Sequence, residues 1–221
     1  MGEMRVCELK VFNKIKPEIS EVFDIGTYTD VDYYNLHPTA IYHLFEPMKE
    51  PYENLKKFSL GKNNIRVNNA GCSNNSKKEK MYKNISSIFI RTHDITTNLN
   101  EFEMVDMIRL DDYINENGIK NLDFIKIDVE GSEYLVLDGM GDYIDKFKFI
   151  QVEYGGTYRD VPFKNRNLLL KDIFSKLSSY DALKLEDMTF YSSYNESMED
   201  YYCCNYLFYK PQYINLLVKK N

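Results

Sequence analysis

The stretch VFDIGTYTD, residues 22–30, joins an apolar run to a polar loop, and this join decides the fold. Asp24 and Gly26 stand where the apolar residues end. An apolar strand that leads through an acid and a glycine into a short loop is typical of the ligand-binding turn in nucleotide-binding α/β folds. The loop has one glycine, whereas a loop that holds a pyrophosphate usually has three. The sequence therefore favours a nucleoside ligand without phosphates.

The rest of the chain repeats a strand-and-helix pattern. Strand-like apolar runs lie at residues 21–25, 39–47, 64–71, 121–131 and 146–156. Helical spacing of apolar residues follows at 50–60, 132–140 and 166–180. Residues 107–118 look like a strand end followed by a short helix, and two segments at 182–193 and 200–210 alternate like antiparallel strands. We expect an α/β fold with a mainly parallel seven-stranded sheet, an antiparallel C-terminal strand pair and helices on both faces.

No linker rich in Pro or Gly divides the 221 residues, so we expect a single domain. Residues 1–20 form its N-terminal lead-in, 20–155 its cofactor-binding core, and 156–221 the C-terminal helix and strand pair. Residues 68–87 are crowded with Asn, Ser and Lys and are predicted to be a loop.

Composition and charge narrow the class of protein. The formal net charge is -6 and the sequence pI is about 5.2, which argues against a partner that is a nucleic acid. No apolar run approaches the ~20 residues of a membrane span, and the N-terminus lacks the pattern of a secretory signal. Cys7, Cys72, Cys203 and Cys204 form no CxxC pair, so we expect reduced thiols and a cytoplasmic protein, or one of the host cytoplasm or virion if the source is viral.

Four acids stand at the ends of predicted strands. They are Asp24, Glu46, Asp128 and Glu153. Because ligands of a parallel sheet bind beyond the carboxyl ends of its strands, these acids should gather around one site. Glu46 follows Asp24 by roughly 20 residues, the spacing at which such folds place the acid that holds ribose hydroxyls. S-adenosylmethionine is a nucleoside of the expected kind, and its sulfonium is cationic.

Several motifs resemble those of the FkbM-type methyltransferases. They are the D-x-G of residues 24–26, FEP at 45–47, the pair Asn69 and Ala70, LDDY at 110–113, KIDVEGSE at 126–133, and the VE that ends at Glu153. The resemblance covers roughly residues 20–155. It implies a class I, Rossmann-like fold and an O-methyltransferase that uses S-adenosylmethionine.

The resemblance also implies a set of residues that bind the cofactor. They are Asp24, Gly26, Thr27, Tyr28, Asp30, Glu46, Asn69 and Ala70. The family pattern is close to D-x-G-A-N-x-G, so Asp30 stands where a glycine is expected. A carboxylate there either repels the cofactor's carboxylate or attracts its ammonium. The position of the loop is thus that of a cofactor loop, and Asp30 either weakens cofactor binding or directs its carboxylate to the cofactor's ammonium.

The catalytic residues are expected at the end of the fourth strand. Asp128 lies there, with Glu130 and Glu153 as neighbours. Lys126 should project to the same side of the strand as Asp128 and could form an ion pair that lowers the pKa of Asp128. His93 is the alternative base. The acids Asp128 and Glu153 could also hold Mg²⁺.

The histidines His37 and His43 are expected to pack in the core. The tail beyond residue 156 is rich in tyrosine, namely Tyr180, Tyr191, Tyr194, Tyr201, Tyr202, Tyr206 and Tyr209. These rings favour strand packing or a homodimer face, with contact to a carbohydrate as the functional alternative.

The expected reaction is methylation of a hydroxyl of a sugar, glycan or related small molecule. The alternatives are a binding or scaffold domain with impaired cofactor affinity, an RNA 2′-O or cap methyltransferase, and a nicotinamide dehydrogenase, which the missing loop glycines disfavour.

Overall fold

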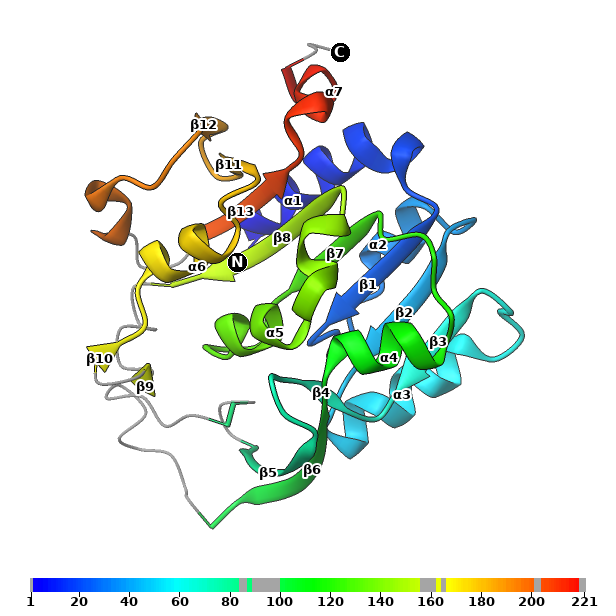
Figure 1. The fold of residues 1–221 in the computed structure, drawn as a ribbon. Coiled ribbons are helices and arrows are strands. Elements are labelled where there is room, and N and C mark those ends of the chain that lie inside the picture. The colour runs from blue at the N-terminus through cyan, green and yellow to red at the C-terminus, as the bar shows by residue number, and fades with distance from the viewer. Residues whose placement is uncertain are drawn as a thin grey trace.

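The structure is a computed structural model, and it describes residues 2–83, 87–88, 100–155, 162–163, 166–200 and 204–218. An eight-stranded sheet with the order β12-β11-β13-β8-β7-β1-β2-β3 forms its centre (Figure 1). The parallel strands are β1 (Glu21–Ile25), β2 (Ile41–Phe45), β3 (Ile65–Asn68), β7 (Phe124–Ile127) and β8 (Phe149–Tyr154). The α/β class and the parallel core are as predicted.

The alternation of side chains in the three central strands gives the sheet two different faces. One face carries Val22, Phe124 and Phe149, and the other carries Phe23 and Ile125. All five side chains are fully buried. A strand that is apolar on both sides must be covered twice, so the sheet lies between two layers of helices.

Helices cover both faces, as the sequence predicts. One layer contains α1 (Gly2–Ile15), α2 (Asp32–Leu36) and α7 (Ile214–Val218), and the other contains α4 (Leu110–Glu116), α5 (Glu133–Gly139) and α6 (Leu170–Lys176). Helix α3 (Lys49–Ser59) packs beside β3. Helix α1 occupies the segment for which the sequence predicts only a lead-in, and Val11, Phe12 and Ile15 bury it against the sheet.

A second sheet with the order β4-β6-β5 corrects the prediction of a loop at residues 68–87. It contains β4 (Gly71–Cys72), β5 (Lys77–Tyr82) and β6 (Phe102–Ile108). Strand β5 is rich in lysine and has little strand propensity of its own, but it pairs with β6 along all six of its residues. Tertiary pairing and the burial of Met81 override the local preference.

The C-terminal region has one strand more than predicted. Residues 182–193 form a hairpin of β11 (Asp181–Lys184) and β12 (Thr189–Tyr191), and β13 (Cys204–Tyr209) joins β11 to β8, all antiparallel. Met188 has φ 58° in the turn, and the Asp187 carboxylate accepts the Thr189 amide at 3.1 Å. This local turn divides the single strand predicted from the alternation.

Three tyrosines of the tail belong to the core. Tyr180, Tyr206 and Tyr209 are buried, and the Tyr180 hydroxyl donates to the carbonyls of Ile144 and Phe147. They serve packing, so for these three rings the alternative of stacking on a sugar is wrong. Tyr201 and Tyr202 lie outside the described residues.

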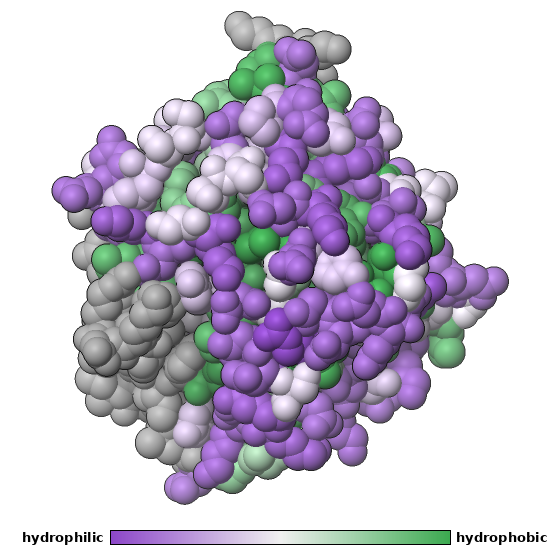
Figure 2. Space-filling model, in the orientation of Figure 1, coloured by the Kyte–Doolittle hydropathy of each residue, from purple (hydrophilic) through white to green (hydrophobic). Residues whose placement is uncertain are grey.

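The remaining elements are short. Within the described residues they are β9 (Pro162–Phe163), β10 (Arg166–Asn167) and the 3₁₀ helices Lys16–Glu18, Gly141–Lys146, Glu196–Asp200 and Pro211–Tyr213. None of the described helices is long and apolar enough to cross a bilayer. The face turned to the viewer in Figure 2 is largely hydrophilic, with hydrophobic residues in small separate areas.

The close contact between α5 and the segment after β4 makes a prediction about stability. A Cβ added at Gly139 would lie 2.1 Å from the Ser73 carbonyl oxygen, so Gly139→Ala should lower the free energy of unfolding by about 3 kcal/mol despite the better helix propensity of alanine. The control is Gly118→Ala, where nothing lies within 4 Å but φ is +60°, and a loss of about 1 kcal/mol is expected. Urea unfolding measures both; equal losses would contradict the packing explanation.

Candidate active site

The turn after β1 brings two strand ends into direct contact. Gly26 has φ +82°, and a Cβ there would lie 1.9 Å from the carbonyl oxygen of Asp128 at the end of β7. The amides of Gly26 and Thr27 both donate to the Phe45 carbonyl of β2, at 3.1 and 3.2 Å. Only glycine fits this position, so the glycine of the predicted loop is required by close packing of three strand ends.

A cavity of about 310 Å³ opens at these strand ends. Of the residues predicted to form the site, it is lined by Gly26, Tyr28, Glu46, Asp128 and Glu130. Its other walls are mainly apolar and contain Ile25, Pro47, Met48, Gly71, Cys72, Met81, Ile88, Met107, Val129 and Ser132. The cavity therefore joins an apolar wall to an acidic one.

Glu46 lies on the acidic side, at the end of β2, and is 4% exposed. Its Oε2 accepts the Tyr28 amide at 2.9 Å and its Oε1 accepts the Met48 amide at 2.7 Å. Each oxygen keeps a second lone pair that a hydroxyl could use. Burial raises the pKa of Glu46 to about 7, although the two amide bonds favour the carboxylate.

The predicted pairing of Lys126 with Asp128 is present. Lys126 Nζ lies 2.9 Å from Asp128 Oδ2. Burial opposes the charge of Asp128, but the Lys126 ammonium and a hydrogen bond from Glu153 hold the pKa of Asp128 below its usual range. Burial and the Asp128 charge raise the pKa of Glu153. At neutral pH, Asp128 is therefore ionised and its neighbour Glu153 is protonated.

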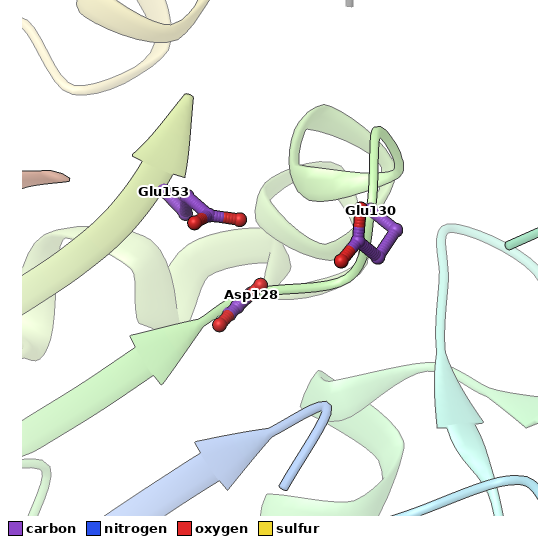
Figure 3. Close-up of side chains that lie close together, drawn as sticks. All are labelled: Asp128, Glu130 and Glu153. Atoms are coloured by element: carbon purple, nitrogen blue, oxygen red, sulfur yellow. The ribbon is translucent and has the colours of Figure 1, made fainter. Parts of the chain in front are cut away.

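Asp128, Glu130 and Glu153 form one cluster (Figure 3), and their carboxylate oxygens lie within 4.8 Å of one another. Glu130 belongs to a turn in which it has φ 55° and Gly131 has φ 104°. The buried Glu133 holds this turn, because its Oε1 accepts the amides of Val129 and Gly131, each at 3.1 Å. Glu133 thus sets the position of Glu130 relative to Asp128.

Asp30 turns toward the N-terminal helix. Its carboxylate pairs with Arg5 and also accepts the Asp32 amide at 2.8 Å, at the start of α2. Asp30 is not among the described residues that line the cavity. The Asp30 carboxylate is therefore directed to Arg5, an arrangement that differs from both of those predicted for it, repulsion of a ligand carboxylate and attraction of a ligand ammonium.

The other predicted cofactor residues lie behind or beside the cavity. Asp24 is buried, its Oδ1 has no hydrogen-bond partner among the described residues, and burial raises its pKa to about 6. Thr27 donates to the Asp24 carbonyl at 2.9 Å. Asn69 donates to the carbonyls of Glu46 and Pro47, and Ala70 is buried next to it. These residues support the strand ends.

The histidines fall into two groups. His93 lies outside the described residues. His43 is in the core, as predicted, where its ring nitrogens lie 2.8 Å from Glu21 Oε1 and 2.9 Å from the Tyr113 hydroxyl. His37 is only partly buried, so the prediction of core packing is wrong for this residue, and its Nε2 lies 2.8 Å from the Ile19 carbonyl oxygen.

Sequence reasoning missed the apolar wall and Glu133. Met81 and Met107 come from strands of the second sheet, in a region read as a loop and a strand end, so no periodicity pointed to them. Glu133 stands inside the quoted KIDVEGSE motif. An acid at the first position of a helix, just after a glycine turn, could have identified it as the residue that receives the turn amides.

Comparison with known proteins agrees with the motifs. A family model described as the methyltransferase FkbM domain matches residues 24–181. No curated protein sequence showed significant similarity to the chain.

Solved structures of similar fold include three methyltransferases. The METTL16 MTase domain has a TM-score of 0.49 and 11% identity, over 93% of this chain and 67% of that chain. An rRNA methylase from Streptococcus thermophilus has a TM-score of 0.48 and 11% identity, over 94% of this chain and 96% of that chain. The N-methyltransferase NodS from Bradyrhizobium japonicum has a TM-score of 0.47 and 10% identity, over 94% of each chain.

The buried carboxyl of Glu133 makes a prediction about pH. Burial raises its pKa from 4.5 to about 8, so the folded state holds a proton that the unfolded state has lost between these values. Its contribution to stability is therefore present below pH 4.5 and is lost as the pH rises to about 8, with a slope of at most about 1.4 kcal/mol per pH unit. Glu133→Gln, which keeps the oxygen that accepts the turn amides, should remove this slope.

Urea unfolding at several pH values measures the difference between Glu133→Gln and the wild type. Glu116→Gln on the exposed side of α4 is the matched control and should follow the wild type. A stability curve of the Glu133→Gln variant that runs parallel to that of the wild type across this window would show that Glu133 titrates normally.

Proposed function

This chain belongs to the FkbM family of S-adenosylmethionine-dependent methyltransferases, and we propose that it is an O-methyltransferase acting on a hydroxyl of a sugar, glycan or related small molecule. The observation that carries the proposal is Asp128, which pairs with Lys126 and lines the cavity beside Glu130 and Glu153. The proposal treats residues 1–221 as one domain, because α1 packs on the same sheet as the matched region.

The residues of the cavity suit the cofactor. Glu46 can accept the two ribose hydroxyls, and the methionine-rich wall offers apolar contact for a base. The absence of a Cβ at Gly26 leaves backbone at the surface of the cavity. The buried Asp24, with an oxygen that lacks a partner among the described residues, adds negative charge behind the loop, which favours a cationic ligand.

The acid cluster supports transfer to a hydroxyl. S-adenosylmethionine, when bound, supplies a methyl group activated by its sulfonium. A free hydroxyl is a weak nucleophile, so a proton acceptor must lie close to it. Asp128 can take that proton as the acceptor oxygen bonds to the methyl carbon. Because the pKa of Asp128 is low, proton transfer should come late, and Lys126 keeps the carboxylate oriented meanwhile.

The charge of the site favours a neutral acceptor. Glu46, Asp128 and Glu130 line the cavity. A polyanion such as RNA would meet repulsion there, whereas a saccharide would find hydrogen-bond acceptors. The proposal includes a cytoplasmic location, which the free thiols of Cys7, Cys72 and Cys204 support.

Mg²⁺ is a further part of the proposal. Asp128 and Glu153 are its proposed ligands, and Glu130 stands within reach of both. Carboxylate oxygens are the ligands that Mg²⁺ prefers. Binding of the ion would require Glu153 to release its proton.

The proposed cofactor can be tested by a binding measurement. Calorimetric titration with S-adenosylhomocysteine should show binding, and Glu46→Gln should weaken it roughly tenfold or more through loss of charged hydrogen bonds to the ribose. Glu50→Gln, the same chemical change at an exposed position of α3, is the control and should bind as the wild type does. No heat and no thermal stabilisation with the wild type would favour the alternative of a scaffold domain.

The proposed acceptor can be tested by a labelling measurement. Labelled S-adenosylmethionine should transfer its methyl group to a member of a panel of nucleotide sugars and free deoxysugars, and not to capped RNA or phenols. Asp128→Asn should still bind S-adenosylhomocysteine but lose roughly 100-fold or more in turnover, whereas Asp112→Asn at an exposed position of α4 should not. Label in RNA alone would replace the saccharide with a nucleic acid, and insensitivity to a chelator would remove Mg²⁺.

A further inference from the structure

Arg5 of α1 lies at the far end of the loop that follows β1. Its guanidinium pairs with Asp30, lies 2.9 Å from Glu8 Oε2 and 3.3 Å from Asp32 Oδ2, and stacks 5.0 Å from the centre of the Tyr33 ring. The Arg5 side chain is 23% exposed, so these contacts form in a partly desolvated environment. A planar guanidinium can satisfy several carboxylates at once, which an ammonium cannot do with the same geometry.

Hydrogen bonds from the amides of the loop connect the acids that Arg5 holds to the cavity. The Asp30 amide donates to the Thr27 carbonyl at 3.0 Å, and the Asp32 amide donates to Asp30 Oδ1 at 2.8 Å. Two residues before Asp30, the Tyr28 amide donates to Glu46 Oε2 at 2.9 Å. The loop therefore contacts Glu46 through the Tyr28 amide and Arg5 through the Asp30 carboxylate.

The negative charges around Arg5 explain why the loop needs this contact. Glu8, Asp30 and Asp32 converge on the Arg5 guanidinium, and without a cation between them their mutual repulsion would push the loop away from α1. Tyr28 has φ 52°, an unfavourable conformation for a residue with a side chain. A loop released at Asp30 would be free to relax this strain and move the Tyr28 amide off Glu46.

We propose that Arg5 is a positioning residue for cofactor binding, which acts by holding Asp30 so that the Tyr28 amide stays on Glu46. Arg5 lies before the region that matches the family, residues 24–181, so α1 supplies to the loop a contact from outside that region. This inference rests on the proposed cofactor. It also explains the aspartate in place of the expected glycine, because Asp30 serves as the attachment point for Arg5.

A purely structural role for Arg5 would have a different signature. Arg5 would then join α1 to the sheet, and its loss would lower the melting temperature without changing the affinity of the folded protein. The two roles separate when affinity is measured at a temperature at which circular dichroism shows every variant to be folded.

The experiment compares the full-length wild type with Arg5→Ala, Arg5→Lys, Asp30→Asn and the Arg5→Ala/Asp30→Asn double variant. Lys10→Ala removes a positive charge from an exposed position of the same helix and is the matched control. The readout is the Kd for S-adenosylhomocysteine by calorimetry. We expect Arg5→Ala to bind roughly tenfold more weakly, Arg5→Lys to recover part of the loss, and Lys10→Ala to equal the wild type. The double variant should bind no more weakly than the weaker single variant.

Two results would overturn the inference. One is unchanged affinity in Arg5→Ala and Asp30→Asn with only a lower melting temperature, and the other is strict additivity of the two losses. If Arg5→Ala does not fold, Arg5→Lys and Asp30→Asn decide the question in the same way. A wild type that binds no S-adenosylhomocysteine would refute the proposed cofactor itself and this inference with it.

Discussion

The buried ammonium of Lys126 is the charge on which the arrangement of acids depends. Lys126 is 5% exposed, and it lies on β7 in register with Asp24 of β1 and Gln151 of β8. An isolated cation in such a place would cost several kcal/mol. Here Asp128 pairs with it, and the surrounding acids raise the pKa of Lys126 despite its burial. The Lys126 ammonium and the surrounding carboxylates therefore each lower the free-energy cost of burying the other.

This balance divides the acids of the strand ends into two kinds. Asp128 takes the direct contact with Lys126 and stays ionised. The acids farther from the ammonium are protonated more readily than Asp128, because burial raises the pKa of Asp24 to about 6 and that of Glu46 to about 7, and also raises that of Glu153. The acids of the strand ends look alike in the sequence, but in the structure Asp128 has a lowered pKa and its neighbours have raised ones. This difference is the basis of the role proposed for Asp128.

The parts of the site that could be predicted from the sequence are those that lie at strand ends. Gly26, Glu46 and Asp128 each follow an apolar run directly, so the parallel sheet determines where they meet. The parts that could not be predicted depend on partners distant in the chain. From the sequence alone, the Asp30 carboxylate could be expected to repel a ligand, and only the structure shows that it pairs with Arg5. The lysines of β5 indicate a loop, because they have little strand propensity, and the sequence gives no sign of the pairing with β6. That pairing places Met81 at the cavity.

The strand order has a consequence for synthesis of the chain. Strand β1 lies inside the sheet between β2 and β7. Its pairing with β7, in which Val22 is opposite Phe124, can form only after residues 124–127 have been synthesised. Until then the emerging half presents β1 as an open edge, with unpaired amides and carbonyls beside apolar side chains. Long-range parallel pairing of this kind is slow and exposes the nascent chain to aggregation. Helix α1 is completed first, and its contact through Phe12 with Phe124 can form only after that delay.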